Sequence, residues 1–149
     1  MTWTALAAGD GADCLAAVVA GLVGLAEIPP ELKGETECSW YRAQRFLRRH
    51  ERELYSVPLD RPVLVKAGEP DFKARPSLWI TSTPNGPHAV IGIGDNVAHD
   101  PAEESPLPSY TVTRVAGLQR APHRMAPFAP ECGCWVCPES PTGWRWYGY

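Results

Sequence analysis

The chain has 149 residues, of which 44 % are hydrophobic and 21 % charged, and its formal net charge is -3. This length and composition predict one globular core of ordinary size, and they exclude a disordered or fibrous chain. The slightly negative charge argues against nucleic acid as a partner, because duplex DNA favours a clearly basic surface.

The apolar run Leu15–Ala26 is the candidate for a secretion signal or a membrane span. It lacks the preceding Lys or Arg of a signal, and Asp10 and Asp13 stand there instead. It is also too short, and too interrupted by glycine, to cross a bilayer. The five cysteines are an odd number with uneven spacing, unlike a secreted disulfide framework. We therefore expect a protein of the reducing cytoplasm, or of a phage particle, without a membrane partner.

The first predicted element is a helix over residues 10–25, DGADCLAAVVAGLVGL. Asp10 or Asp13 can cap its start by accepting hydrogen bonds from free backbone amides. Its larger apolar residues recur at steps of three and four: Leu15, Val18, Val19, Leu22 and Val23. The alanines and glycines between them allow close packing, so this helix is expected to be buried.

A second helix is predicted over residues 38–55. Its apolar side carries Trp40, Ala43, Leu47 and Leu54, and its other side carries Arg42, Arg45, Arg49 and Arg52. Glu51 and Glu53 interrupt the basic side. We interpret the arginines as a solvated helix face rather than a nucleic-acid surface.

After Pro58 the hydrophobic period changes to that of short strands separated by turn residues. The predicted strands are 62–67, 77–83, 88–94, 96–100 and 110–118. Helices followed by hairpin-connected strands predict an α+β domain with a mostly antiparallel sheet.

Three residues on these elements have the types and chain order of a catalytic triad. Cys14 stands near the start of the first helix, where free N–H groups and the helix dipole favour a thiolate. His88 heads one predicted strand, and Asp100 ends the next. A histidine beside the thiol would act as base and acid, and a carboxylate behind it would fix its orientation.

Each of these residues also has an ordinary structural interpretation. Cysteine is common in apolar cores, histidine is common at strand ends, and aspartate before proline often opens a turn. His99 is a second candidate imidazole, but alternation along a strand would direct it away from Asp100.

The motifs DCLAAVVAGLVGL, HAVIG and AHDP resemble those of small papain-like cysteine peptidases. The bacteriocin leader-processing (double-glycine) peptidases and small relatives in phage and bacterial genomes are the most similar group. The resemblance covers about residues 1–105. It implies a peptidase-type domain over 1–121, a peptide or peptide-like substrate and no cofactor for catalysis. In that case Cys14 is the nucleophile, His88 the general base and acid, and Asp100 the orienting residue.

One feature of such enzymes is missing from this chain. Papain-like enzymes place a glutamine before the cysteine to stabilise the oxyanion, whereas this chain has only Gln44 and Gln119. Backbone amides at the helix start, including that of Cys14, are the remaining donors. The alternative is therefore a catalytically impaired protein of the same fold that serves in binding or assembly.

The last segment, 122–149, is predicted to be an irregular extension rich in cysteine and aromatic residues. Cys132, Cys134 and Cys137, with His123 upstream, form a candidate site for zinc or an iron–sulfur cluster. Reduced cysteines without a ligand role, or a disulfide, are the alternatives. The aromatic residues Trp135, Trp144, Trp146, Tyr147 and Tyr149 favour docking, either on the parent domain or on a protein partner or larger assembly.

Overall fold

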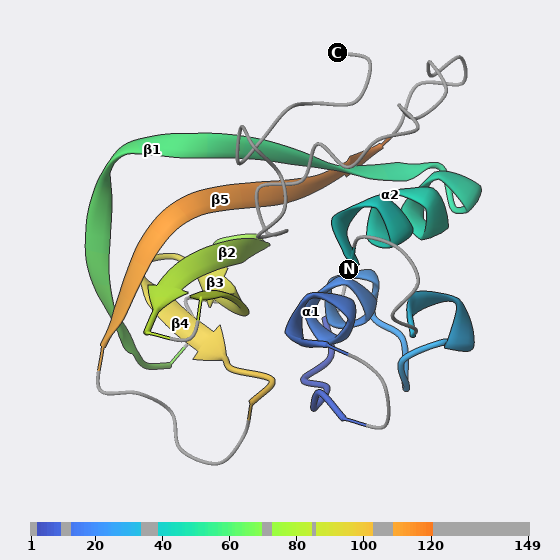
Figure 1. The fold of residues 1–149 in the computed structure, drawn as a ribbon, viewed down its shortest axis with the longest axis horizontal. Coiled ribbons are helices and arrows are strands. Elements are labelled where there is room, and N and C mark those ends of the chain that lie inside the picture. Colours follow the sequence, from blue (N-terminus) through green and yellow to red (C-terminus); the bar gives the residue numbers. More distant parts are fainter. Residues whose placement is uncertain are drawn as a thin grey trace.

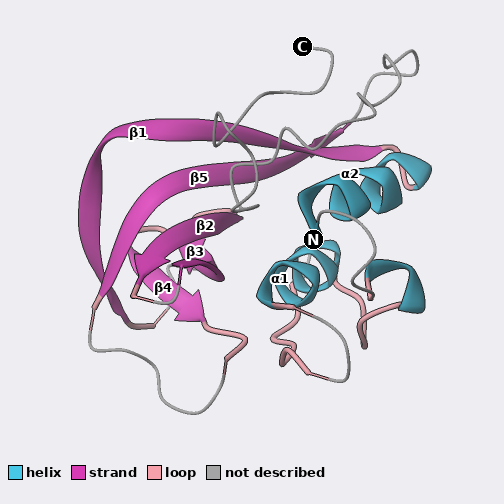
Figure 2. Cartoon of the chain, in the orientation of Figure 1, coloured by secondary structure: helices cyan, strands magenta, loops and turns pink. Residues whose placement is uncertain are grey.

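The computed structural model describes residues 3–9, 13–33, 39–69, 73–84, 86–102 and 109–120. In chain order the elements are α1 (Cys14–Val23), the 3-10 helix η1 (Pro30–Leu32), α2 (Ser39–Arg49), β1 (Arg52–Ala67), β2 (Pro76–Thr83), β3 (Gly86–Ile93), β4 (Asn96–His99) and β5 (Tyr110–Arg120) (Figure 1). Figure 2 shows the helices grouped on one side of the strands. The predicted α+β class is confirmed, while the predicted extension 122–149 lies outside the described residues.

The helix α1 is the buried helix that the sequence predicts. It begins after Asp13, whose side chain accepts a 2.7 Å hydrogen bond from the Ala16 amide. It ends at Gly24, which adopts a left-handed φ of 88° that glycine tolerates without strain. Eight of its ten residues are buried. No helix among the described residues is long and apolar enough to cross a membrane.

The predicted second helix, 38–55, is wrong at its C-terminal end, because α2 stops at Arg49 and the chain continues as β1. The chain turns at Glu51, which has a left-handed φ of 57°. The buried Gln44 then holds Leu54 in the strand, since its amide group both donates to and accepts from the Leu54 backbone at 3.0 Å. Helical spacing places Leu54 on the apolar side of the predicted helix. This periodicity carries no information on the hydrogen bonds between Gln44 and the Leu54 backbone.

The sheet is closed, with strand order β1-β4-β3-β2-β5. Four of its pairings are antiparallel, as predicted, and the short β1–β4 pairing is parallel. The predicted strand 62–67 is only the end of the 16-residue β1, whose pairing with β5 shifts register between residues 58 and 63. Figure 1 shows β1 and β5 arching together around the shorter strands.

The two faces of the central strands form two apolar clusters. One cluster packs α1 and α2 against Leu78, Ile80, Ala89 and Ile91. The other contains the alternate residues of the same strands, Trp79 and Val90, together with Val97, Tyr110 and Val112. The first cluster fixes the start of α1 against the sheet, and the second holds the start of β5.

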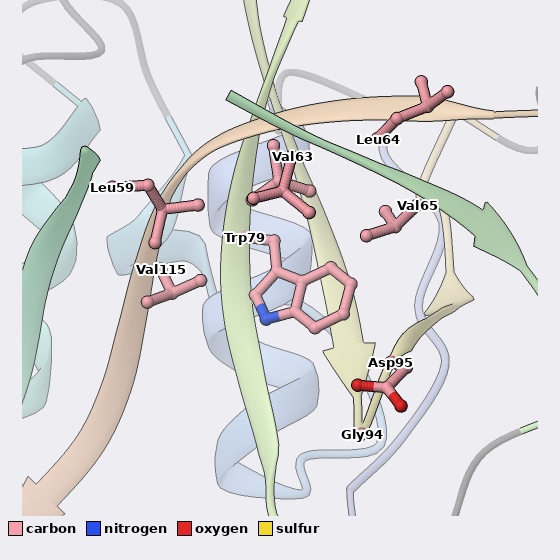
Figure 3. A pocket seen from close by; sticks show the side chains of 9 residues that line it. Leu59, Val63, Leu64, Val65, Trp79, Gly94, Asp95 and Val115 are labelled. Atoms are coloured by element: carbon pink, nitrogen blue, oxygen red, sulfur yellow. The ribbon is translucent and has the colours of Figure 1, made fainter. Parts of the chain in front are cut away.

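Trp79 lies at the centre of an open pocket of about 320 Å³ (Figure 3). Aliphatic residues from β1 and β5 surround the indole, and Asp95 lies at one end. None of the predicted triad residues lines this pocket. It is therefore separate from the candidate catalytic residues.

Replacing Gly92 with alanine is expected to destabilise the protein by about 1–3 kcal/mol, because a new methyl group would overpack the second cluster. A Cβ at Gly92 would lie 1.9 Å from Cε2 of Trp79, whose indole is also held by a 2.8 Å hydrogen bond from Nε1 to Ser77. The urea midpoint measures this loss. The matched control is Gly117→Ala on β5, where a Cβ would meet nothing within 4 Å. An equal urea midpoint for the two variants would contradict the close approach of Gly92 to the Trp79 indole.

Candidate active site

Cys14 is the first residue of α1, and its side chain is a half-buried free thiol. The first N–H groups of a helix have no intrahelical partner. Asp13 satisfies the amide of Ala16, and its backbone carbonyl accepts from Ala17 at 3.1 Å. Within the described part of the chain, the amides of Cys14 and Leu15 have no hydrogen-bond partner, which makes them candidate donors to a bound oxyanion.

Asp13 also ties the start of α1 to α2. Its carboxylate accepts a hydrogen bond from the Ser39 hydroxyl and lies 3.7 Å from the Arg42 guanidinium. Arg42 is 5 % exposed, and its Nε donates to the Leu32 carbonyl at 3.1 Å. The interpretation of Arg42 as part of a solvated face is therefore wrong, because this arginine fixes the segment that presents Cys14.

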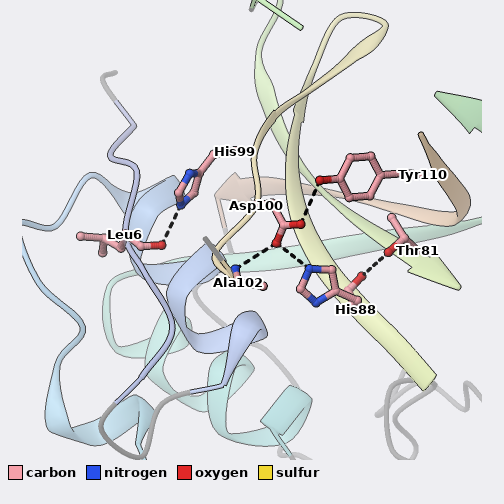
Figure 4. A network of polar contacts seen from close by, with 7 residues as sticks. All are labelled: Leu6, Thr81, His88, His99, Asp100, Ala102 and Tyr110. Carbon is pink, nitrogen blue, oxygen red and sulfur yellow. Dashed lines mark hydrogen bonds and ion pairs between the residues drawn. The ribbon is translucent and has the colours of Figure 1, made fainter. Parts of the chain in front are cut away.

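His88 and Asp100 meet across two neighbouring antiparallel strands, as the sequence predicts. His88 lies near the start of β3, and Asp100 directly follows β4. His88 Nε2 and Asp100 Oδ1 are 2.7 Å apart (Figure 4). The His88 backbone is held in turn by Thr81, whose hydroxyl donates to the His88 carbonyl at 3.1 Å. Both site side chains are largely buried, with 16 % and 9 % of their surfaces exposed.

Cys14 lies near enough to His88 to affect the pKa of the imidazole. The hydrogen bond to Asp100 is the main cause that raises the pKa of His88 from 6.5 to about 10. Cys14 adds to this rise, and burial opposes it. Because Asp100 engages Nε2, the ring nitrogen left for the thiol is Nδ1. The structure thus brings together all three predicted triad residues.

Asp100 is held by more donors than the sequence indicates. Oδ1 also accepts from the Ala102 amide at 2.9 Å, and Oδ2 accepts from the Tyr110 hydroxyl at 2.9 Å. Burial alone would raise the pKa of Asp100, but the hydrogen bonds from His88, Ala102 and Tyr110 hold it below its ordinary 3.8. The sequence predicts Tyr110 only as the first residue of a strand, and nothing in its pattern distinguishes it from a core aromatic residue.

The other polar candidates lie elsewhere in the described part of the chain. His99 faces away from Asp100, as alternation predicts, with its Nε2 2.7 Å from the Leu6 carbonyl oxygen. Gln44 bonds the Leu54 backbone, and Gln119 donates to Glu53 at 2.7 Å. Neither glutamine is therefore placed to stabilise an oxyanion at Cys14.

The candidate metal ligands Cys132, Cys134, Cys137 and His123 lie outside the described residues. Within the described ranges, no group of three or more His, Cys, Asp or Glu residues could hold a metal ion. The zinc or iron–sulfur site stays a prediction from the sequence.

The site can perform nucleophilic chemistry. A thiol in contact with an imidazole, which is itself held by a carboxylate, is the arrangement that attacks carbonyl groups and transfers the proton of the nucleophile.

Comparisons of the chain with protein-family models, with curated proteins and with solved structures found no match.

Proposed function

We propose that this protein is a papain-like thiol hydrolase that cleaves an amide bond in a peptide or peptide-like substrate. The observation that carries the proposal is that His88 hydrogen-bonds to Asp100 and lies near enough to Cys14 for this residue to raise the pKa of the imidazole. A buried helix presents the thiol, and two paired strands present the imidazole and the carboxylate. This is the division of roles that the resemblance to papain-like peptidases implies.

The proposed reaction has two halves. In the first, the Cys14 thiolate attacks the substrate carbonyl carbon, and protonated His88 gives its proton to the departing amine, which leaves a thioester. In the second, His88 removes a proton from water, and the resulting hydroxide attacks the thioester. The acid product leaves, and the thiolate–imidazolium pair returns. Asp100 stays ionised and holds the His88 ring throughout.

The tetrahedral intermediates need donors for their oxyanion. Among the described residues, the amides of Cys14 and Leu15 have no hydrogen-bond partner, because Asp13 caps Ala16, so these amides are the proposed donors. Loss of one oxyanion donor typically lowers a rate by about 10²–10³. We therefore expect slower turnover than in an enzyme that adds a glutamine side chain.

A binding or assembly protein with an impaired peptidase site is the second candidate function. The observation that favours it is the engagement of both Gln44 and Gln119 away from Cys14. In this case the partner would be a protein or a larger assembly, phage structures included, and the aromatic segment 122–149 would be the docking element.

The proposed hydrolase activity predicts a covalent intermediate on Cys14. The reduced protein is incubated with a complex peptide mixture, quenched in acid and analysed by intact mass spectrometry, while new peptide ends are sequenced. We expect an acyl adduct on Cys14 and newly formed peptide ends. Cys14→Ala should abolish both, because it removes the nucleophile without removing a large core side chain.

A second measurement distinguishes the two candidate functions. Iodoacetamide should label Cys14 faster than the remaining cysteines, since an imidazolium stabilises a neighbouring thiolate. Equally slow labelling of all cysteines would contradict the hydrolase proposal. Fast labelling without adducts or cleavage, with partner binding that requires residues 122–149, would support the impaired binding protein.

A further inference from the structure

Both oxygens of the Asp100 carboxylate are engaged, and by different elements. Oδ1 accepts from His88 on β3 and from the backbone of Ala102, whereas Oδ2 accepts from Tyr110 at the start of β5. Figure 4 shows the carboxylate between the imidazole and the phenol. Rotation of the carboxylate about its Cβ–Cγ bond would break these contacts together.

Tyr110 is itself held firmly in the fold, so it can restrain the Asp100 side chain. It is 1 % exposed, pairs with Val65 of β1 and packs in the second apolar cluster. A buried phenol hydroxyl needs a hydrogen-bond partner, and here the partner is the carboxylate oxygen that does not face His88. Packing fixes the Tyr110 ring, and the hydrogen bond from its hydroxyl group therefore restrains the Asp100 carboxylate.

We infer that Tyr110 is a positioning residue of the candidate site, holding the plane of the Asp100 carboxylate so that His88 keeps Nδ1 directed at Cys14. This inference rests on the proposed function for its catalytic meaning, but the contacts that carry it do not involve substrate. It extends the chain of contacts from three residues to four, Cys14–His88–Asp100–Tyr110.

The charge balance of the site agrees with this role. Among the described residues, the titratable groups that act on His88 are Cys14 on α1 and Asp100 after β4. Burial of Asp100 acts against its ionised form, and the Tyr110 hydroxyl is one of the donors that lower the pKa of the carboxyl. Removal of that hydroxyl leaves Oδ2 without this donor in a largely buried place. The carboxylate then becomes both freer to rotate and easier to protonate.

The test is Tyr110→Phe, which keeps the ring and removes the hydroxyl. The pH at which the Asp100 carboxyl titrates, followed by carbon NMR, should move upward. Alkylation of Cys14 by iodoacetamide at neutral pH should slow by about tenfold, the size expected for losing a hydrogen bond to a charged group. A purely structural role would lower the urea midpoint without moving the Asp100 titration.

The matched control is Tyr55→Phe, since Tyr55 is 60 % exposed on β1. It should change neither the Asp100 titration nor the alkylation rate. Combining Tyr110→Phe with Asp100→Ala gives a double-mutant cycle. If Tyr110 acts through Asp100, Tyr110→Phe should have no further effect on alkylation in the Asp100→Ala protein. A full tenfold effect in that background would overturn the inference.

A measurement that keeps Tyr110 unchanged covers the case in which Tyr110→Phe does not fold. The hydroxyl proton of Tyr110 should be protected from solvent exchange in the wild-type protein and should lose that protection in Asp100→Ala. Equal protection in both proteins would overturn the inference. None of these readouts uses a substrate. A protein that cleaves no peptide but shows the Asp100 shift would refute the proposed function alone, and a cleaving protein without the shift would refute the inference alone.

Discussion

Replacing His88 with glutamine is expected to lower peptide cleavage by about 10²–10⁴, the usual contribution of a positioned acid and base. Glutamine fills a similar volume, but it cannot carry the proton from the thiol side to the leaving amine. It also removes the positive charge that the raised pKa of His88, about 10, maintains beside Cys14 at neutral pH. Alkylation of Cys14 by iodoacetamide should therefore slow toward that of an ordinary thiol.

The matched control for this variant is His99→Gln. His99 is the residue before Asp100, but its ring lies against the Leu6 carbonyl and Trp3 rather than in the site. It should leave alkylation of Cys14 unchanged and affect only stability. If the two variants slowed alkylation equally, His88 would have no special relation to the thiol, and the assignment of the triad would fail.

The placement of Cys14, His88 and Asp100 could be predicted because each of them depends on local sequence. An aspartate followed by a regular apolar stripe predicts the start of α1 and so places Cys14 near free amides. The spacing of His88 and Asp100 spans one tight hairpin, and antiparallel pairing then brings them together. Alternation within β4 correctly separates His99 from Asp100.

The parts that could not be predicted depend on contacts distant in sequence. Tyr110 reaches Asp100 only because β5 pairs with β1 and β2 and places its first residue beside the end of β4. The early end of α2 depends on Gln44 reaching the Leu54 backbone, which no periodicity reports. The burial of Arg42 is likewise explained by its hydrogen bond to the Leu32 carbonyl, which its position in a row of arginines does not indicate.

The buried carboxylate of Asp100 provides His88 with a negative charge and with a hydrogen bond, and two variants separate these contributions. Asp100→Ala removes both the charge and the hydrogen bond, so we expect a loss of about 10²–10⁴ in cleavage rate. Asp100→Asn can still accept from His88 Nε2 and the Ala102 amide through its carbonyl oxygen, and it can present its amide to Tyr110. We expect it to retain more of the rate than Asp100→Ala. Equal rates would show that orientation by residue 100 contributes nothing.

The same two variants should change how stability depends on pH. The pKa of His88 is raised from 6.5 to about 10 in the folded protein, so between these values the folded state holds a proton that the unfolded state has lost. The His88 contribution to stability is therefore fully present below pH 6.5 and is lost as pH rises through about 10. Because the hydrogen bond to Asp100 is the largest cause of the raised pKa, both variants should flatten the fall in urea midpoint across this window. An unchanged slope in both variants would mean that His88 is not charged at neutral pH, and the thiolate–imidazolium pair would have to be abandoned.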